Sequence, residues 1–289
     1  MAIKGEGKRM EKIAKHIESW LKDYSIKSGL NGFVVGISGG IDSAVTSTLC
    51  ARTGLEVIAL NMPIYQKIEQ VKLSESHIRW LEKNFTNVKG VKVDLTASFQ
   101  AIEKSLPKEI QDGLTMANTR SRLRMVTLYA FASHHKLLVA GTGNKVEDFG
   151  VGFYTKYGDG GVDISPIADL FKTEVSALGK YLGVSEDIIK ATPTDGLWDD
   201  SRTDESQIGA SYPELEWAMR YELNRANIMN ECANGRRASS KNECDNSADE
   251  TLLSEREQKV LSIYRKFNRI NSHKMLPIPI CKIPDNLKI

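Results

Sequence analysis

The chain has 289 residues, of which 41% are hydrophobic and 26% are charged. This composition is that of an ordinary globular protein, and the length suits one large α/β domain or two small ones. The formal net charge of +2 excludes a general attraction to nucleic acid or membrane, so an anion would need locally placed binding groups. The N-terminus is too charged for a secretory signal, and no run of 18 apolar residues occurs. We therefore expect a cytoplasmic protein without a membrane span.

The predicted elements alternate between helices and strands over the first half of the chain. Apolar side chains at helical spacing from Met10 to Tyr24 predict an amphipathic helix before the first strand. Short apolar, β-branched runs predict buried strands at 33–37, 56–63, 91–95 and 136–144. Helices are expected near 44–51, 68–84, 98–104 and 118–134, and later near 173–182, 214–223 and 255–267.

Strands that alternate with helices predict an α/β fold with a doubly wound, Rossmann-like parallel sheet flanked by helices. In such sheets ligands bind beyond the carboxyl ends of the strands, where the strand order reverses. The loops after the first, second and fourth strands all lie at that edge.

Two segments beyond residue 150 break the alternation. Residues 151–166 contain four glycines and three aromatic side chains, which is too distinctive for a plain linker. Residues 229–250 are polar and nearly free of apolar side chains, so we expect a mobile insertion there. Cys232 and Cys244 flank eleven residues in that segment, and no second close-spaced Cys or His pair completes a zinc site.

The stretch 36–43, GISGGIDS, joins the first strand to a helix and has the chemistry of an anion-binding loop. Backbone N–H groups converge at a helix start, glycines permit close approach, and the Ser38 and Ser43 hydroxyls can add donors. It is not a Walker loop, because no lysine follows Gly40. Asp42 would repel phosphates unless a cation lay between them, so it indicates magnesium. The alternative is a tight turn that Asp42 caps.

The loop resembles the pyrophosphate loop of the adenylating ATP pyrophosphatases, which include NAD, GMP and asparagine synthetases and tRNA-thiolating enzymes. Three further stretches narrow the resemblance to ammonia-dependent NAD synthetases: residues 141–175, residues 191–216 with ATPTDGLW and TDESQIGASYPELE, and HKMLPIP at 273–279. The match runs in order over nearly the whole chain and fails mainly at the polar insertion. It implies the adenine nucleotide alpha-hydrolase type of fold.

The resemblance also implies a single NAD synthetase domain over 1–289. Its core would cover roughly 8–225, the insertion about 229–250, and a C-terminal helix and substrate-contacting tail 251–289. At Asn61 the chain departs from many relatives, which place a basic residue near the adenosine.

The resemblance implies a role for each matching position. Asp42, Lys172 and Asp159 would be catalytic, with Lys172 supplying the positive charge that the loop lacks, and Asp42 and Glu147 would bind Mg²⁺. ATP would contact Gly36, Ile37, Ser38, Gly39, Gly40, Ile41, Asp42, Ser43, Thr142, Lys172 and Thr194. Deamido-NAD, the nicotinic acid dinucleotide, would contact Arg122, Lys156, Tyr157, Asp163, His273 and Lys274.

These side chains also have structural alternatives. Lys156 and Lys172 could be solvated surface lysines, and Arg122 could belong to the exposed basic face of a helix. Glu147 could be a helix first-turn acid, and His273 and Lys274 could be exposed near the C-terminus. On the residues alone these alternatives stay open.

The implied reaction has two steps, in which ATP adenylates the nicotinate carboxylate of deamido-NAD and ammonia then displaces AMP to give NAD. Residues 1–31 are too short for a glutamine-hydrolysing domain, so we expect ammonia as the nitrogen source. Residues 194–205 are the expected lid, and the resemblance implies a homodimer with the dinucleotide site at the interface. The rival functions are another pyrophosphatase, such as a tRNA-modifying enzyme, and an ATP-sensing module without turnover.

Overall fold

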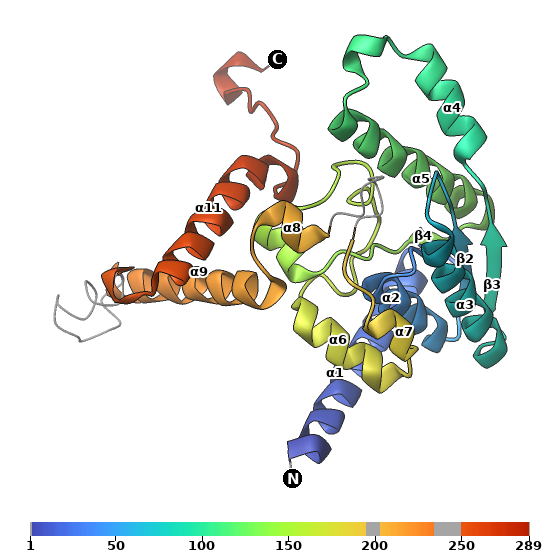
Figure 1. Ribbon diagram of the computed structural model, residues 1–289, viewed down its shortest axis with the longest axis horizontal. Helices are drawn as coiled ribbons and strands as arrows, with labels where there is room; N and C mark the ends of the chain where they lie inside the picture. Colours follow the sequence, from blue (N-terminus) through green and yellow to red (C-terminus); the bar gives the residue numbers. More distant parts are fainter. Residues whose placement is uncertain (1, 195–202, 234–249, 289) are drawn as a thin grey trace.

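Figure 1 shows the computed structural model of the chain, which describes residues 2–194, 203–233 and 250–288. The first half alternates strands and helices as predicted, and the second half is helical. In chain order the elements are α1 (Ala2–Lys27), β1 (Gly32–Gly36), α2 (Ile41–Arg52), β2 (Glu56–Asn61), α3 (Ile68–Asn84), β3 (Val88–Lys92), α4 (Thr96–Ser105), η1 (Lys108–Ile110), α5 (Gly113–His135), β4 (Leu138–Val139), η2 (Val146–Val151), α6 (Lys172–Leu182), α7 (Glu186–Ile189), α8 (Asp204–Ile208), α9 (Tyr212–Ala233), η3 (Glu250–Leu252), α11 (Glu255–Met275) and η4 (Asp285–Leu287).

The described strands form one parallel sheet in the order β3-β2-β1-β4. The chain moves from β1 outward to β2 and β3, and then returns to place β4 on the other side of β1. The strand order therefore reverses between β1 and β4, which is where a ligand site is expected in a doubly wound sheet. The predicted fold class is confirmed.

Alternate strand residues face two separate layers of helices. Phe33 and Val35 of β1 pack in one hydrophobic cluster with residues of α1, α2, α3 and α6. Val34, between them, packs in another cluster with Phe99 of α4 and Met116 of α5. Because β1 is buried on both faces, its sequence is a continuous apolar run rather than an alternating one.

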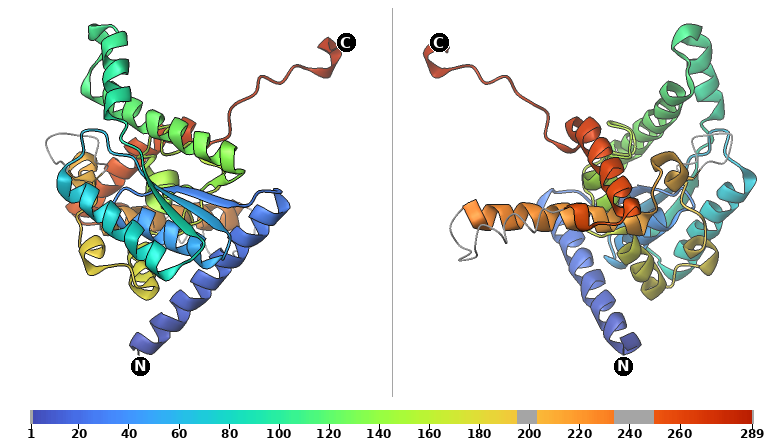
Figure 2. Two further views of the ribbon diagram at one scale, coloured as in Figure 1. Left: turned by 90° about the vertical axis from the view of Figure 1, so that its right-hand side faces the viewer. Right: turned by 60° about the vertical axis from the view of Figure 1, so that its left-hand side comes forward.

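Two long helices, α9 and α11, lie side by side and extend away from the sheet (Figures 1 and 2). Their core is a third hydrophobic cluster, which includes Leu215 and Ala218 of α9 and Leu261 of α11. Val146 and Val151 of η2 also belong to this cluster. The turn that follows β4 therefore connects the edge of the sheet to the pair of helices α9 and α11, which we call the helical arm.

Several predicted boundaries were wrong. The β3 ladder covers Val88–Lys92 instead of 91–95, although the extended chain continues past it with a 2.9 Å bond from the Val93 N–H to the Asn61 carbonyl. The β4 ladder is only two residues long, instead of 136–144. Helix α5 begins at Gly113 because the Asp112 carboxylate caps it, accepting from the Thr115 N–H at 3.0 Å.

The two arm helices are longer than their local patterns indicate. Helix α9 runs to Ala233, so the polar segment predicted from residue 229 starts inside a helix, and residues 234–249 lie outside the described residues. Helix α11 runs to Met275, so His273 and Lys274 lie in its last turn and not in an extended tail.

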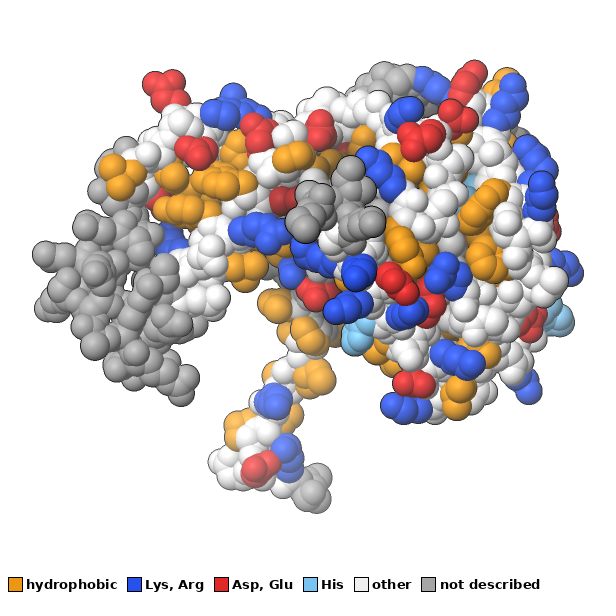
Figure 3. Space-filling model, turned by 90° about the horizontal axis from the view of Figure 1, so that it is seen from below, with side chains coloured by type: hydrophobic (Ala, Val, Ile, Leu, Met, Phe, Trp, Pro, Cys, Tyr) orange, Lys and Arg blue, Asp and Glu red, His pale blue; other side chains and the backbone are white. Residues whose placement is uncertain are grey.

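The surface mixes charges of both signs. On the face seen in Figure 3, acidic and basic side chains are interspersed, which agrees with the small net charge. Throughout 2–194, 203–233 and 250–288, no helix combines the length and apolar character that crossing a membrane requires.

Candidate active site

The candidate site begins with the loop between β1 and α2, at the carboxyl edge of the sheet. The N–H of Ser38 donates to Ser43 Oγ, and the N–H of Gly40 donates to Ser38 Oγ, both at 3.2 Å. The Ser43 hydroxyl donates to the Gly40 carbonyl at 3.0 Å. These bonds hold the loop in a tight turn, and no side chain caps α2 at Gly40. The N–H groups of the first turn of α2 are therefore available to an anion.

The ammonium of Lys172 reaches this loop from the first residue of α6. Its Nζ bonds to Asp42 Oδ2 and lies 3.1 Å from Glu147 Oε1, and the side chain is 9% exposed. Asp42 lies in the first turn of α2, and Glu147 lies in η2, just beyond β4. Three elements distant in the sequence thus bring three of the predicted residues to one point.

Two more side chains complete this cluster; they were not predicted as site residues, although both lie in stretches that carry the family resemblance. Asn144 Nδ2 donates to Asp42 Oδ1 at 3.3 Å, while its Oδ1 accepts from the Glu147 N–H at 3.2 Å. The Tyr212 hydroxyl donates to Glu147 Oε1 at 2.5 Å, and Lys172 Nζ lies 4.7 Å from the centroid of the Tyr212 ring. Asn144 and Tyr212 therefore fix the orientation of the two carboxylates.

Burial and neighbouring charges shift the pKa values of the ionisable side chains in the cluster. Burial alone would lower the pKa of the Lys172 ammonium, but the Asp42 and Glu147 carboxylates outweigh it and raise that pKa. Burial raises the pKa of Asp42, and burial together with the nearby carboxylates raises the pKa of Asp148 to about 8. The Lys172 ammonium therefore faces two carboxylates, Asp42 and Glu147, and one ammonium against two carboxylates favours a further cation.

A second group of predicted residues lies where α5, the glycine-rich segment and α11 meet. Arg122 Nε donates to the Lys156 carbonyl at 3.3 Å, and Lys156 Nζ donates to the His273 carbonyl at 2.8 Å. Lys274 Nζ donates to the Tyr154 carbonyl at 2.7 Å, and burial lowers the pKa of Lys274. Four of the residues predicted to contact deamido-NAD are thus neighbours.

Tyr157 and Asp159 belong to the same glycine-rich segment but differ in their surroundings. Tyr157 is 52% exposed and has a backbone φ of 61°. Asp159 Oδ1 accepts from the Ser121 hydroxyl at 2.6 Å and from the Thr155 N–H at 3.0 Å. These bonds join the segment to α5, and burial raises the pKa of Asp159. The predicted catalytic role of Asp159 stays a prediction.

The three remaining predicted contacts are Asp163, Thr142 and Thr194. The Asp163 carboxylate accepts from the Tyr129 hydroxyl at 2.9 Å and from the Val139 N–H at 2.8 Å, which ties it to α5 and β4. Thr142 is half-buried in the turn after β4, and Thr194 is exposed. Of the predicted lid, residues 195–202 lie outside the described residues.

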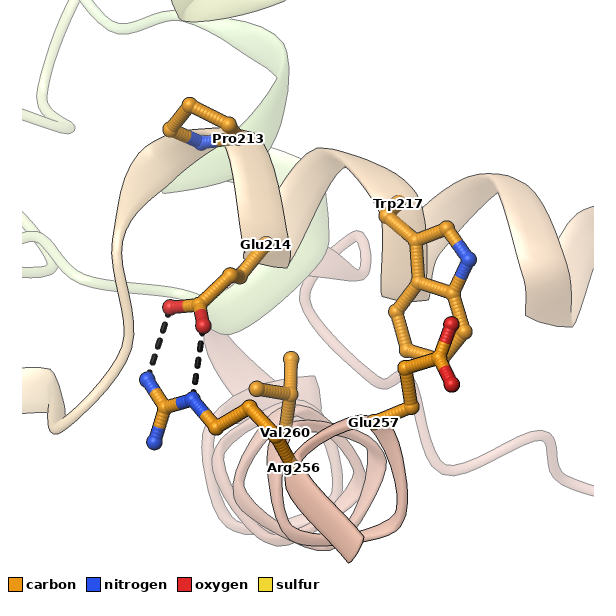
Figure 4. A pocket seen from close by; sticks show the side chains of 6 residues that line it. All are labelled: Pro213, Glu214, Trp217, Arg256, Glu257 and Val260. Atoms are coloured by element: carbon orange, nitrogen blue, oxygen red, sulfur yellow. Dashed lines mark hydrogen bonds and ion pairs between the residues drawn. The ribbon is translucent and has the colours of Figure 1, made fainter. Parts of the chain in front are cut away.

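A pocket of about 280 Å³ lies between the first turns of α9 and α11 (Figure 4). Glu214 and Arg256 close one side of it through two bonds of 2.6 and 2.7 Å. None of its lining residues is a predicted site residue. The lining consists of Pro213, Glu214, Trp217, Arg256, Glu257 and Val260.

The sequence matches one described protein family over most of its length. The profile of the family described as NAD synthase matches residues 13–251. The chain belongs to the NAD synthase family.

Individual proteins agree with this assignment. The NH3-dependent NAD+ synthetase of Carboxydothermus hydrogenoformans is 39% identical over 211 residues, which are 71% of this chain and 84% of that protein. That of Methanocaldococcus jannaschii is 40% identical over 214 residues, 73% of this chain and 80% of that protein. Among solved structures, the NMN synthetase of Francisella tularensis has a TM-score of 0.74 and 28% identity, and covers 96% of this chain and 98% of its own.

In this NAD synthase the Asp42 and Glu147 carboxylates suit a cation that a bound nucleotide also coordinates. They do not form a metal site made of protein groups alone. No group of three or more His, Cys, Asp or Glu side chains arranged for metal binding occurs in the part of the chain that the structure describes. Asp42 and Glu147 nevertheless converge on one point, since both contact the Lys172 ammonium. Mg²⁺ at nucleotide sites takes one or two carboxylates, and phosphates and waters supply the rest. The pair fits that requirement.

Asn61, where the resemblance leads us to expect no basic contact to the adenosine, ends β2 beside the phosphate loop. Its side chain is 4% exposed, and its Nδ2 has no hydrogen-bond partner in the described part of the chain. The Leu60 carbonyl before it accepts from the Ile37 N–H at 2.8 Å, so Asn61 is adjacent to the loop. The predicted lack of a basic adenosine contact at this position stays a prediction.

Gly39→Ala should weaken ATP binding roughly tenfold or more. Gly39 has a φ of +90°, and an added Cβ would lie 2.9 Å from the Gln70 carbonyl oxygen, so the loop must move. Left-handed strain at a non-glycine residue costs about 1–3 kcal/mol. The measurement is the KM for ATP, with Gly54→Ala as control, because Gly54 has a φ of +77° but no neighbouring atom within 4 Å. An unchanged KM for ATP in Gly39→Ala would contradict the prediction that ATP binds against this loop.

Proposed function

We propose that this NAD synthase is an ammonia-dependent NAD synthetase, which adenylates the nicotinate carboxylate of deamido-NAD with ATP and amidates it with ammonia. The products are NAD, AMP and pyrophosphate. The observation that carries the proposal is the Lys172 ammonium held between Asp42 and Glu147 beside an uncapped SGGIDS loop. Relatives of about 39% identity, named NH3-dependent NAD+ synthetases, support the reaction class.

The phosphate loop would hold the β- and γ-phosphates of ATP, which leave as pyrophosphate. The first-turn N–H groups of α2 and the Ser38 and Ser43 hydroxyls face a site where negative charge grows as the α-phosphorus is attacked. The Lys172 ammonium supplies the positive charge that the loop lacks. Donors fixed in place before the reaction stabilise such charge without reorganising, which is how this site would lower the barrier.

Asp42 and Glu147 would hold Mg²⁺, which supplies charge neutralisation for the phosphates when it is bound. The oxygen atoms of the two carboxylates are oriented by Asn144 and Tyr212, so the protein contributes a fixed donor pair. Thr142 and Thr194 are the further positions that we propose to contact ATP.

The acid substrate would lie against the second group of residues. Arg122, Lys156, His273 and Lys274 bring three basic side chains and one imidazole to one place, which suits a dinucleotide with a pyrophosphate and a carboxylate. We assign Tyr157, Asp159 and Asp163 to the same substrate side. Positioning of the carboxylate against the α-phosphorus is the main task of these residues.

We further infer that residues 1–289 form one domain and that the protein acts as a homodimer in the cytoplasm, with the dinucleotide site at the interface. Arg122, Lys156 and Lys274 donate to backbone carbonyls of their own chain, which orients these side chains before a ligand binds. Sedimentation at micromolar concentration checks the dimer, and a monomer with full activity would contradict it.

A second candidate function is the same amidation of a smaller acid substrate, a mononucleotide in place of the dinucleotide deamido-NAD. The Francisella tularensis NMN synthetase aligns with nearly the full length of both chains, and the same amidation of a nicotinate mononucleotide would give NMN. The relatives of 39–40% identity are named NH3-dependent NAD+ synthetases, which favours the dinucleotide.

Purified protein with ATP, Mg²⁺ and ammonium should release pyrophosphate only when the acid substrate is present. We expect deamido-NAD to be converted to NAD with a kcat/KM at least about tenfold above that for nicotinate mononucleotide, since each tenfold step needs only about 1.4 kcal/mol of differential binding. Mass spectrometry of the amide product checks the assignment. Pyrophosphate release without either acid contradicts the proposed reaction, and NAD formation from glutamine as fast as from ammonium contradicts the nitrogen source.

A further inference from the structure

Tyr212, the first residue of α9, contacts both charged groups that face the phosphate loop. We propose that Tyr212 is a positioning residue for the cation site, with its hydroxyl fixing the Glu147 carboxylate and its ring receiving the Lys172 ammonium. The proposal rests on the proposed function, because it takes Glu147 as a ligand of the cation that accompanies ATP.

The hydroxyl has one proton and two carboxylate neighbours. It lies 2.5 Å from Glu147 Oε1 and 3.2 Å from Asp204 Oδ2, so the proton goes to Glu147. A phenol has an ordinary pKa of about 10, so at neutral pH the Tyr212 hydroxyl keeps its proton and is a donor. A hydrogen bond from a neutral phenol fixes one Glu147 oxygen and leaves the other free for a cation.

The ring of Tyr212 provides a second contact to the same pair. Lys172 Nζ lies 4.7 Å from the ring centroid, within the range of a cation–π interaction. A cation bound by Asp42 and Glu147 repels the ammonium, which contacts the same two carboxylates. The ring gives the ammonium a favourable neighbour when it turns from those oxygens toward the phosphates.

The rest of α9 fixes this arrangement. One helical turn after Tyr212, the buried Glu216 carboxylate accepts from the Thr173 N–H at 2.9 Å and from the Thr173 hydroxyl at 2.7 Å. Thr173 follows Lys172 at the start of α6. The same face of α9 therefore holds the start of α6 through Glu216 and the lysine head group through Tyr212.

The test is direct binding of Mn²⁺, as a spectroscopic substitute for Mg²⁺, to the full-length protein saturated with a non-hydrolysable ATP analogue. Electron paramagnetic resonance should show that Tyr212→Phe binds Mn²⁺ roughly 10- to 100-fold more weakly than wild type, the usual effect of losing a partner of a metal ligand. Tyr264→Phe is the matched control, because Tyr264 is also buried in the α9–α11 core. Its Mn²⁺ affinity should equal that of wild type.

A double-mutant cycle separates positioning from a general structural effect. In a Glu147→Gln background, Tyr212→Phe should change Mn²⁺ affinity by less than about twofold, because the hydroxyl acts through the carboxylate that is already gone. Wild-type Mn²⁺ affinity in Tyr212→Phe overturns the proposal, and so does an equal loss in both backgrounds.

Steady-state kinetics give a readout that a loss of folding does not imitate. Tyr212→Phe should raise the Mg²⁺ concentration needed for half-maximal rate and leave the KM for deamido-NAD unchanged. An equal rise in both values overturns the proposal. Mn²⁺ binding requires no acid substrate, so the binding test stands even if the wild-type protein forms no NAD and the proposed function fails.

Discussion

Lys172→Ala should lower deamido-NAD-dependent pyrophosphate release by roughly 100- to 1,000-fold, the usual cost of removing a positioned group that stabilises developing charge. The loop itself has no cation, and the Lys172 ammonium reaches it from a residue 130 positions away. Nothing else in the cluster of Asp42, Asn144, Glu147 and Tyr212 carries a positive charge. The measurement is single-turnover pyrophosphate release at saturating ATP.

The control for this substitution is Lys145→Ala. Lys145 Nζ pairs with the exposed carboxylate of Asp169 at 2.7 Å, and surface pairs of this kind contribute about 0–1 kcal/mol. Its rate should stay within about twofold of wild type, a change of less than 0.5 kcal/mol. Pyrophosphate release at the wild-type rate in Lys172→Ala would show that the phosphates are neutralised in another way.

The same substitution has a predictable effect on stability. It leaves the buried Asp42 and Glu147 carboxylates without their common partner, and loss of one member of a buried ion pair costs about 3–5 kcal/mol. Because a divalent cation can replace the ammonium between the carboxylates, millimolar Mg²⁺ should restore part of the loss in Lys172→Ala. Urea unfolding with and without Mg²⁺ measures this, and no Mg²⁺ effect would argue against a cation site at the two carboxylates.

His77 should make the protein acid-sensitive between pH 6.5 and 4. The side chain is 2% exposed, lies between α3 and α2, and has its Nε2 3.0 Å from Ser47 Oγ. Burial lowers the pKa of His77 from 6.5 to about 4. In that window the unfolded chain binds a proton that the folded protein does not, so stability falls as the pH falls. The full loss over this window is about 3 kcal/mol at 1.36 kcal/mol per pKa unit.

Urea unfolding at pH 7 and pH 4.5 checks this prediction. His77→Gln keeps a hydrogen-bonding group at Ser47 but does not titrate, so its loss of stability on acidification should be about 2.5 kcal/mol smaller than that of wild type. His134→Gln, at an exposed position of α5, is the matched control. If wild type and His77→Gln lose the same free energy, another group causes the acid sensitivity.

The parts of the fold and site that local sequence determines could be predicted. The apolar run of β1, the glycine turn and the start of α2 are contiguous, so the loop and its place at the sheet edge follow from one stretch of sequence. The place of Lys172 beside the loop could not be derived from local patterns, because it depends on how α6 packs, and it was expected only from the family resemblance. Its ion pair with Asp42 was not predicted.

The misplaced boundaries and the missed residues have physical reasons too. Helix α11 extends past its amphipathic stretch because its last turns pack on the end of η2, where Asn268 and Asn271 donate to backbone carbonyls at 2.8 Å. Lys274 therefore lies in a helix, although its Nζ still reaches the glycine-rich segment as a substrate contact would require. Tyr212 was missed because a tyrosine at the start of a helix is ordinary. Its role depends on the hydrogen bond to Glu147, which forms only because η2 places that carboxylate beside the Tyr212 hydroxyl.

The position of Lys172 between two hydrophobic cores links the nucleotide to the integrity of the whole chain. Phe171, the residue before it, packs in the α9–α11 core, whereas Val175, one turn later, packs against the sheet. A nucleotide held by both the loop and Lys172 would bridge these two cores as a clamp. Binding would then oppose separation of the helical arm from the sheet, and its free energy would add to the cohesion of the native state.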